Sequence, residues 1–200
     1  METKQSIFSR FGEQVTTLLG LAGLLWVIEI VDWLLFKNYL PQFFGVQPRS
    51  IRGLLGIASA PFLHGDFAHL FANTLPLVTL GWLVMLRGRG EWILVSIITA
   101  LCSGLGTWLF GASNSTHIGA SGVIFGYFGF LLLRGYFERS FTAIAFSLLV
   151  AFLYGGIIFG VLPTDQTISW QGHLFGFLGG ILAARLLAKP RREYKDNYDV

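Results

Sequence analysis

Six hydrophobic segments constrain the fold of this chain more than any other feature of its sequence. They comprise residues 15–36, 62–86, 92–110, 118–133, 141–162 and 170–188. Several of them exceed the roughly 18 apolar residues that indicate a transmembrane helix. The chain is also only 12% charged, about half the charged fraction that is usual for a soluble domain. We therefore predict an all-α integral membrane protein, with a six-helix transmembrane domain (15–188) between two short tails (1–14 and 189–200).

The basic residues predict how this bundle is oriented in the membrane. Eleven Lys and Arg residues lie in or beside the tails and the connections after the second and fourth segments, against three in the other connections. Because cytoplasmic loops carry the excess of basic residues, we expect both termini to be cytoplasmic. The fourth and sixth segments then begin near the extracytoplasmic surface.

Composition excludes some classes of partner and site. The net charge of +3 is small and lies mostly at the ends of the segments, which gives no footprint for nucleic-acid binding. Cys102 is the single cysteine. The sequence therefore excludes an intrachain disulfide and a cysteine metal cluster.

Two acids and a long connection stand out in the first part of the chain. Glu29 and Asp32 lie three residues apart in the first segment and so share one helical face. Acids inside a span are functional candidates, but these two lie near the end of the segment, and we favour a structural role. In the connection 37–61, apolar residues alternate with Arg49 and Arg52. This pattern predicts short amphipathic helices at the membrane interface, with an ordinary ordered linker as the alternative.

The fourth segment is short and contains a candidate nucleophile, Ser121. Residues 118–133 make a helix of about 24 Å, against about 30 Å for the bilayer core. With Arg134 at one surface, the end that carries Ser121 lies inside the membrane. Irregular backbone at that depth needs a protein-lined or watery cavity, which marks a candidate site. A short helix with a serine N-cap is the alternative.

Polar residues of two other segments fall at the same depth as Ser121. His69 and Asn73 of the second segment are four residues apart and share one helical face. His64 of the same segment points about 140° away from that face on a regular helix. His173 lies in the first turn of the sixth segment. Three segments thus bring a hydroxyl, imidazoles and an amide to one level.

Glycine spacing predicts that the fourth and sixth segments pack closely. Glycines four residues apart let helix backbones approach each other. Such faces are formed by Gly122 and Gly126 in the fourth segment, and by Gly172, Gly176 and Gly180 in the sixth. If these faces meet, Ser121 and His173 come within hydrogen-bond reach, as a nucleophile and its base must.

These residue types suit acyl transfer. An imidazole can take the proton of a serine hydroxyl near neutral pH and return it to a leaving amine. The N–H groups of Asn73, His69 and the Ser121 backbone can stabilise the oxyanion that results. No acid is placed to orient His173, which predicts a Ser–His dyad held by packing. The alternatives are histidines that only pack, or a metal site of three histidines, which the divergence of His64 and His69 disfavours.

In these residues the chain resembles the rhomboid intramembrane serine proteases. The resemblance rests on three motifs in the order of the family: His64-Gly65-x3-His69-x3-Asn73, Gly119-Ala120-Ser121-Gly122 and His173-x2-Gly176-x3-Gly180. It covers residues 15–188 and includes the six-segment pattern and the long first connection.

The resemblance implies a role for each matching residue. The expected roles are Ser121 as nucleophile, His173 as base, His69, Asn73 and the Ser121 backbone as oxyanion hole, and His64, Phe125, Gly119 and Gly122 as support. The expected substrates are transmembrane segments of other membrane proteins, cleaved in or near the bilayer without metal or cofactor. We expect a prokaryotic cell-membrane enzyme whose site opens to the extracytoplasmic side. Substrates are expected to enter laterally near the fifth segment, beside a cap at about 162–169.

The chain departs from the family pattern at two places. Phe125 stands where a tyrosine often packs on the catalytic histidine, so we expect His173 to be held by stacking alone. A Trp-Arg pair of the first connection is absent, and Gln47-Pro48-Arg49 stands in that region. Neither departure removes a residue of the predicted dyad.

Two other functions remain open on the sequence alone. One is a non-catalytic rhomboid-like scaffold that binds membrane proteins, although such proteins usually lack the serine or the histidine. The other is a small transporter or proton channel that uses Glu29, Asp32 and the histidines. Neither function needs a serine and a histidine on glycine-faced neighbouring helices.

Overall fold

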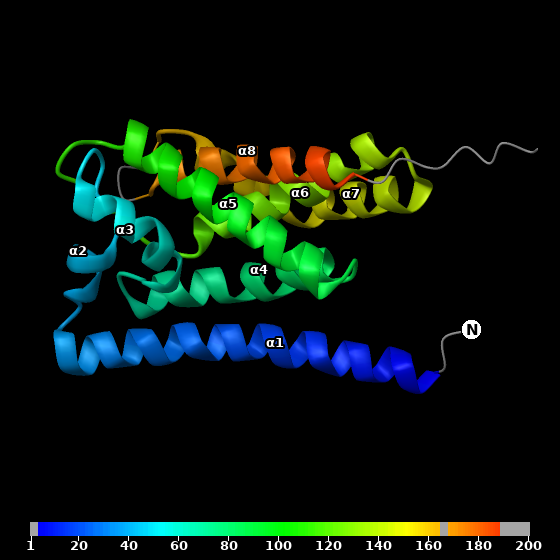
Figure 1. The fold of residues 1–200 in the computed structure, drawn as a ribbon, viewed down its shortest axis with the longest axis horizontal. Coiled ribbons are helices and arrows are strands. Elements are labelled where there is room, and N and C mark those ends of the chain that lie inside the picture. The colour runs from blue at the N-terminus through cyan, green and yellow to red at the C-terminus, as the bar shows by residue number, and fades with distance from the viewer. Residues whose placement is uncertain (1–3, 165–167, 189–200) are drawn as a thin grey trace, which may run out of the picture.

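Long helices that run back and forth along one axis make up the fold (Figure 1). The computed structural model describes residues 4–164 and 168–188, without the side chains of 4–8. Its long helices are α1 (Lys4–Val31), α4 (Phe67–Met85), α5 (Arg89–Phe110), α6 (Ser121–Glu138), α7 (Phe141–Tyr154) and α8 (Trp170–Leu187). A π-helix (Asp32–Phe36) extends α1, and a 3-10 helix (Gly155–Val161) extends α7. Most of each predicted hydrophobic segment therefore lies in one long helix, but residues 62–66 of the second segment, with His64, precede α4.

Four of these helical stretches in the described residues are long and apolar enough to cross a membrane. They are Ser9–Phe36, Phe67–Met85, Arg89–Phe110 and Phe141–Val161. Helices α6 and α8 have 18 residues each and are rich in glycine. The predicted N-terminal tail is helical from Lys4, and the predicted C-terminal tail, 189–200, lies outside the described residues.

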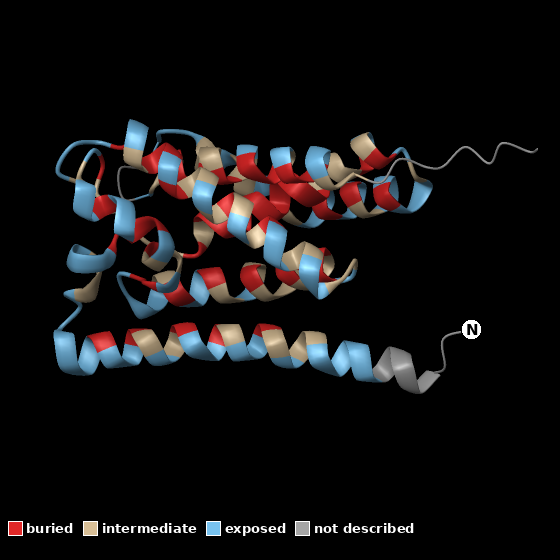
Figure 2. Cartoon of the chain, viewed as in Figure 1, coloured by how far each residue is buried: buried red, intermediate tan, exposed pale blue. Residues whose placement is uncertain are grey.

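Helix α6 forms the centre of the bundle. Every residue from 122 to 131 is buried, and the helix contacts α4, α5, α7 and α8. Figure 2 shows the buried residues gathered on α6 and on the sides of its neighbours, whereas much of α1 is exposed. An apolar helix can be surrounded by protein or by lipid, and the glycines of α6 let its neighbours approach closely enough to bury it.

Helix α7 is the least enclosed of the four long apolar stretches. In an 18-residue window of the Phe141–Val161 stretch only 11% of the residues are buried inside the protein, against 28% to 33% in the windows of the other three. Polar bonds attach it to its neighbours: Ser147 Oγ donates to the carbonyl of Leu131 at 2.7 Å, and the hydroxyls of Tyr154 and Thr79 lie 2.5 Å apart.

Glycines bring α8 into backbone contact with α6. A Cβ at Gly176 would overlap the carbonyl oxygen of Gly122, and a Cβ at Gly180 would overlap that of Gly126. The open sides of Gly122 and Gly126 face Ser103 and Thr99 of α5 instead. The glycines of α6 therefore contact α5 on the side where a side chain would be, and their carbonyls contact α8.

The connection 37–61 folds as short helices, α2 (Leu40–Phe44), α3 (Ile51–Ser59) and a 3-10 turn (Ala60–Phe62). Arg49 fixes this region: its guanidinium donates to the Leu109 carbonyl at 3.1 Å and to Ser113 Oγ at 2.7 Å. Trp108 Nε1 donates to the Ser50 carbonyl at 2.8 Å. The segment without the Trp-Arg pair is thus attached to the end of α5 by other side chains.

The acids of the first segment are buried inside the protein. Glu29 and Asp32 are both 2% exposed. Asp32 Oδ1 accepts the N–H of Leu40 at 3.2 Å, where the chain turns from the π-helix into α2. Asp32 therefore has a structural bond in the first connection.

We predict that Gly180→Ala lowers the stability of the bundle. The new methyl group must displace the Gly126 carbonyl, and overpacking of this kind costs about 1–3 kcal/mol. The apparent Tm in detergent micelles, measured by intrinsic fluorescence, should fall. Gly20→Ala is the matched control, because a Cβ there meets no atom within 4 Å. An equal Tm for both variants would contradict the close packing of α6 and α8.

Candidate active site

Ser121 begins α6 directly after a sharp turn of the backbone. Gly119 has a φ of +108°, in the region that favours glycine, and its N–H donates to the Ala60 carbonyl at 2.9 Å. A Cβ at Gly119 would lie 2.9 Å from the ring of His69 and 3.7 Å from Ser121 Oγ. The turn thus needs glycine for its backbone angle and for the space that His69 occupies.

The structure brings Ser121 and His173 into hydrogen-bond contact. Ser121 Oγ lies 2.8 Å from His173 Nε2. His173 is in the first turn of α8, where its backbone N–H donates to the carbonyl of Ser169 at 3.0 Å. The side chains at the starts of α6 and α8 therefore meet, as the glycine spacing predicted.

Two contacts orient the ring of His173. Phe125 stacks on it with ring centroids 4.1 Å apart and planes 8° apart. His173 Nδ1 lies 2.9 Å from the carbonyl oxygen of Gly160. A carbonyl only accepts hydrogen bonds, so this bond assigns the proton to Nδ1 and leaves the lone pair of Nε2 facing Ser121.

Gly160 is a site residue that the sequence analysis missed. We expected stacking alone to hold His173, but a backbone carbonyl of the 3-10 helix after α7 also holds it. A Cβ at Gly160 would lie 3.2 Å from His173 Nδ1 and 2.7 Å from the ring of Phe125. The sequence shows a glycine 13 residues before the histidine. It does not show that the backbone carbonyl of this glycine bonds the ring, because every residue type has such a carbonyl.

A cavity of about 660 Å³ opens over the Ser121–His173 pair. His69 and Asn73 line it together with the pair, so the four predicted residues share one space. Asn73 Nδ2 donates one hydrogen to the His69 carbonyl at 3.1 Å, and an amide nitrogen has a second hydrogen to donate. Apolar side chains form much of the remaining wall, namely Ala72, Pro76, Ile124, Phe125, Ile157 and Ile168.

His64 lies behind His69 and does not line this cavity. It is 1% exposed, and its ring meets that of His69 edge to face with centroids 5.1 Å apart. Neither ring nitrogen of His64 has a hydrogen-bond partner among the described residues. Its contact with the site therefore runs through the ring of His69.

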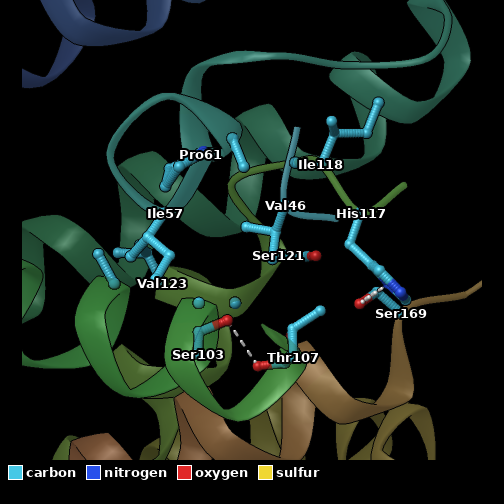
Figure 3. Close-up of a pocket in the computed structure, with 16 residues that line it drawn as sticks. Val46, Ile57, Pro61, Ser103, Thr107, His117, Ile118, Ser121, Val123 and Ser169 are labelled. Carbon is cyan, nitrogen blue, oxygen red and sulfur yellow. Dashed lines mark hydrogen bonds between the residues drawn. The ribbon is translucent and has the colours of Figure 1, made fainter. Parts of the chain in front are cut away.

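A second, smaller cavity of about 30 Å³ lies beside Ser121 (Figure 3). Ser103, Thr107, His117 and Ser169 supply its polar lining, and none of them was among the predicted site residues. Ser103 Oγ donates to the carbonyl of Gly172 at 2.9 Å. A cavity of this size has room for a water molecule, and these four side chains offer it polar partners.

Comparison with known proteins identifies the family of this chain. The family model named Rhomboid domain matches residues 52–190. An uncharacterised protein of Mycobacterium tuberculosis is 41% identical over 186 residues, which cover 89% of this chain and 77% of that protein. Rhomboid protease GluP of Bacillus subtilis is 32% identical over 133 residues, which cover 64% of this chain and 25% of GluP. Rhomboid-like protein 11 of Arabidopsis thaliana is 27% identical over 191 residues, which cover 84% of this chain and 66% of that protein.

The family match covers the helices that carry the site residues, α4, α6 and α8, together with α5 and α7. The apolar helices of the described residues have the length of membrane spans. The chain is an integral multi-pass membrane protein and belongs to the rhomboid family.

Proposed function

We propose that this protein is a serine endopeptidase that cleaves transmembrane segments of other membrane proteins by a Ser121–His173 dyad. The observation that carries the proposal is the 2.8 Å contact between Ser121 Oγ and His173 Nε2. The bond from His173 Nδ1 to the Gly160 carbonyl supports it, because it leaves Nε2 as the proton acceptor.

The dyad can run both halves of an acyl transfer. His173 Nε2 takes the proton of Ser121 while Oγ attacks the carbonyl carbon of the scissile peptide. The same nitrogen then delivers that proton to the leaving amine, and an acyl-enzyme remains. In the second half a water molecule takes the place of the serine hydroxyl.

Three N–H donors are proposed for the oxyanion. They are the second amide hydrogen of Asn73, the ring of His69 and the backbone N–H of Ser121. The Ser121 N–H lies at the start of α6, where the helix dipole favours negative charge. Donors fixed before the reaction stabilise the charge that develops in the transition state.

The small cavity beside Ser121 is proposed to hold the hydrolytic water. Hydroxyls of Ser103 and Thr107 line it, and Ser121 lies on its wall. Most of the surrounding bundle is apolar, so a reaction that consumes water needs a polar reservoir near the nucleophile.

The topology that fits this function has six crossings with both termini in the cytoplasm. The start of α1 and the end of α8 lie at the same end of the bundle (Figure 1), and the basic residues gather in the tails and in the connections at that end. The site then opens toward the extracytoplasmic side. Lateral access beside α7 remains a proposal, and residues 165–167 of the predicted cap lie outside the described residues.

We predict that Ser121→Ala abolishes cleavage of a reporter transmembrane substrate in proteoliposomes. Loss of a nucleophile removes several orders of magnitude of rate. A fluorophosphonate probe should label the native protein and leave Ser121→Ala unlabelled. Undiminished cleavage by Ser121→Ala would rule out the dyad.

We expect the ring of Phe125 to contribute to the rate of cleavage, although it lacks the hydroxyl of the tyrosine that is frequent in the family. Phe125→Tyr should keep full activity, because the stack on His173 is retained. Phe125→Ala should lower kcat about 3- to 10-fold, since an aromatic contact contributes about 0.5–1.5 kcal/mol. The loss is partial because the Gly160 carbonyl still holds the imidazole. Equal kcat values for the three proteins would show that the ring has no role.

Gly119→Ala is expected to inactivate the enzyme while Gly65→Ala does not. An alanine at position 119 would have a strained backbone angle, and its methyl group would lie 2.9 Å from the His69 ring. At Gly65, which lines the larger cavity, a Cβ meets only Ile118 Cδ1 at 3.8 Å. The rate of fluorophosphonate labelling compares the two variants. Similar rates would argue against the tight placement of His69 beside the nucleophile.

A further inference from the structure

His117 lines both cavities beside Ser121 but is not among the proposed nucleophile, base or oxyanion donors, and both nitrogens of its ring are hydrogen-bonded. It lies four residues before Ser121, and its backbone pairs with Val46 through two bonds of 2.9 Å. Its Nδ1 lies 2.7 Å from Ser169 Oγ and its Nε2 lies 2.7 Å from Ser115 Oγ. Figure 3 shows His117 and Ser169 pointing toward each other beside Ser121.

The partners of the ring give these bonds a direction. Ser115 Oγ donates its hydrogen to the Ala112 carbonyl at 2.6 Å, so it accepts from His117 Nε2–H. Nδ1 of the neutral ring is then an acceptor for the hydroxyl of Ser169. Burial lowers the pKa of His117, which favours this neutral form. The chain of bonds thus runs from Ser169 through His117 to Ser115 and ends on a carbonyl.

Ser169 is the residue that connects this chain to the proposed base. It occupies the N-cap position of α8, where a serine hydroxyl usually accepts an N–H of the first turn. Within the described part of the chain its hydroxyl makes no such cap and is bonded to His117 instead. Its carbonyl accepts the backbone N–H of His173. Ser169 therefore holds His117 with its side chain and His173 with its backbone.

We propose that His117 is a positioning residue, which fixes the start of α8 against the start of α6 through Ser169. The inference rests on the proposed function, because the distance it controls is that between Ser121 Oγ and His173 Nε2. His117 is well placed for this task, since its own backbone is anchored to Val46 and leads within four residues to Ser121. Displacement of a reacting group by 1 Å can cost about 10²-fold in rate.

The side-chain chemistry of the variants separates the two bonds of the ring. His117→Phe keeps a ring and removes both bonds. In His117→Asn the amide oxygen takes the place of Nδ1 and can accept from Ser169. In His117→Gln the amide nitrogen takes the place of Nε2 and can donate to Ser115.

We expect His117→Phe and Ser169→Ala to lower kcat for a reporter transmembrane substrate by about 10- to 100-fold, with KM nearly unchanged. His117→Asn should restore most of the rate, whereas His117→Gln should not, and Ser115→Ala should have little effect. The double variant His117→Phe/Ser169→Ala should be no slower than the slower single variant, because both remove the same bond. A raised KM with normal kcat would assign His117 to substrate contact, and rescue by Gln in place of Asn would assign it to the Ser115 loop. Either result would overturn the proposal.

A second measurement is independent of catalysis. The chain has four histidines, so imidazole ¹⁵N spectra of labelled protein are readily assigned by single substitutions. His117 should show the Nε2–H tautomer, and the signals of His173 should shift in His117→Phe and Ser169→Ala but not in Ser115→Ala. Unmoved His173 signals would overturn the positioning role. The two proposals can also fail separately. If the His173 signals shift in these variants but fluorophosphonate does not label the native protein, the positioning role is supported and the proposed protease activity is refuted.

Discussion

Backbone contact between α6 and α8 sets the geometry on which the site depends. Gly176 and Gly180 lie on the carbonyls of Gly122 and Gly126, so the two helices approach as closely as their main chains permit. Ser121 and His173 are fixed to the first turns of these same helices. The distance between the helix axes therefore limits the distance between the two side chains of the proposed dyad. In a membrane this approach has no hydrophobic driving force, and close packing of small residues must supply the attraction.

Neutral groups orient the imidazole of His173 between these two helices. The described partners of His173 are an aromatic face, a backbone carbonyl and the serine hydroxyl. A buried carboxylate would orient the ring as well, but an ionised group inside an apolar bundle carries a large desolvation cost. The Gly160 carbonyl orients the Nδ1–H of His173 as a carboxylate would, but it places no ionised group in the bundle. In the proposed mechanism its dipole would also face the imidazolium that forms when Nε2 takes a proton.

Much of the fold could be predicted from residue types whose spacing indicates a particular structure. Apolar runs of transmembrane length gave the long helices, and glycines four residues apart led to the meeting of Ser121 with His173. Contacts made by the backbone were not foreseeable in this way. The carbonyl of Gly160 and the π-helix at 32–36 carry no side-chain signature. The His117–Ser169 bond joins two loops 52 residues apart, and no periodicity relates loops to each other.

The sparse enclosure of α7 has a consequence for how this protein meets the bilayer. The 3-10 extension of α7 carries both Ile157, on the wall of the larger cavity, and Gly160, the acceptor of the His173 ring. Acyl chains solvate the outer side of that helix about as well as another helix would, so its position reflects the thickness and lateral pressure of the surrounding lipid. A shift of this one element would therefore change both the wall of the larger cavity and the hydrogen bond to His173 Nδ1.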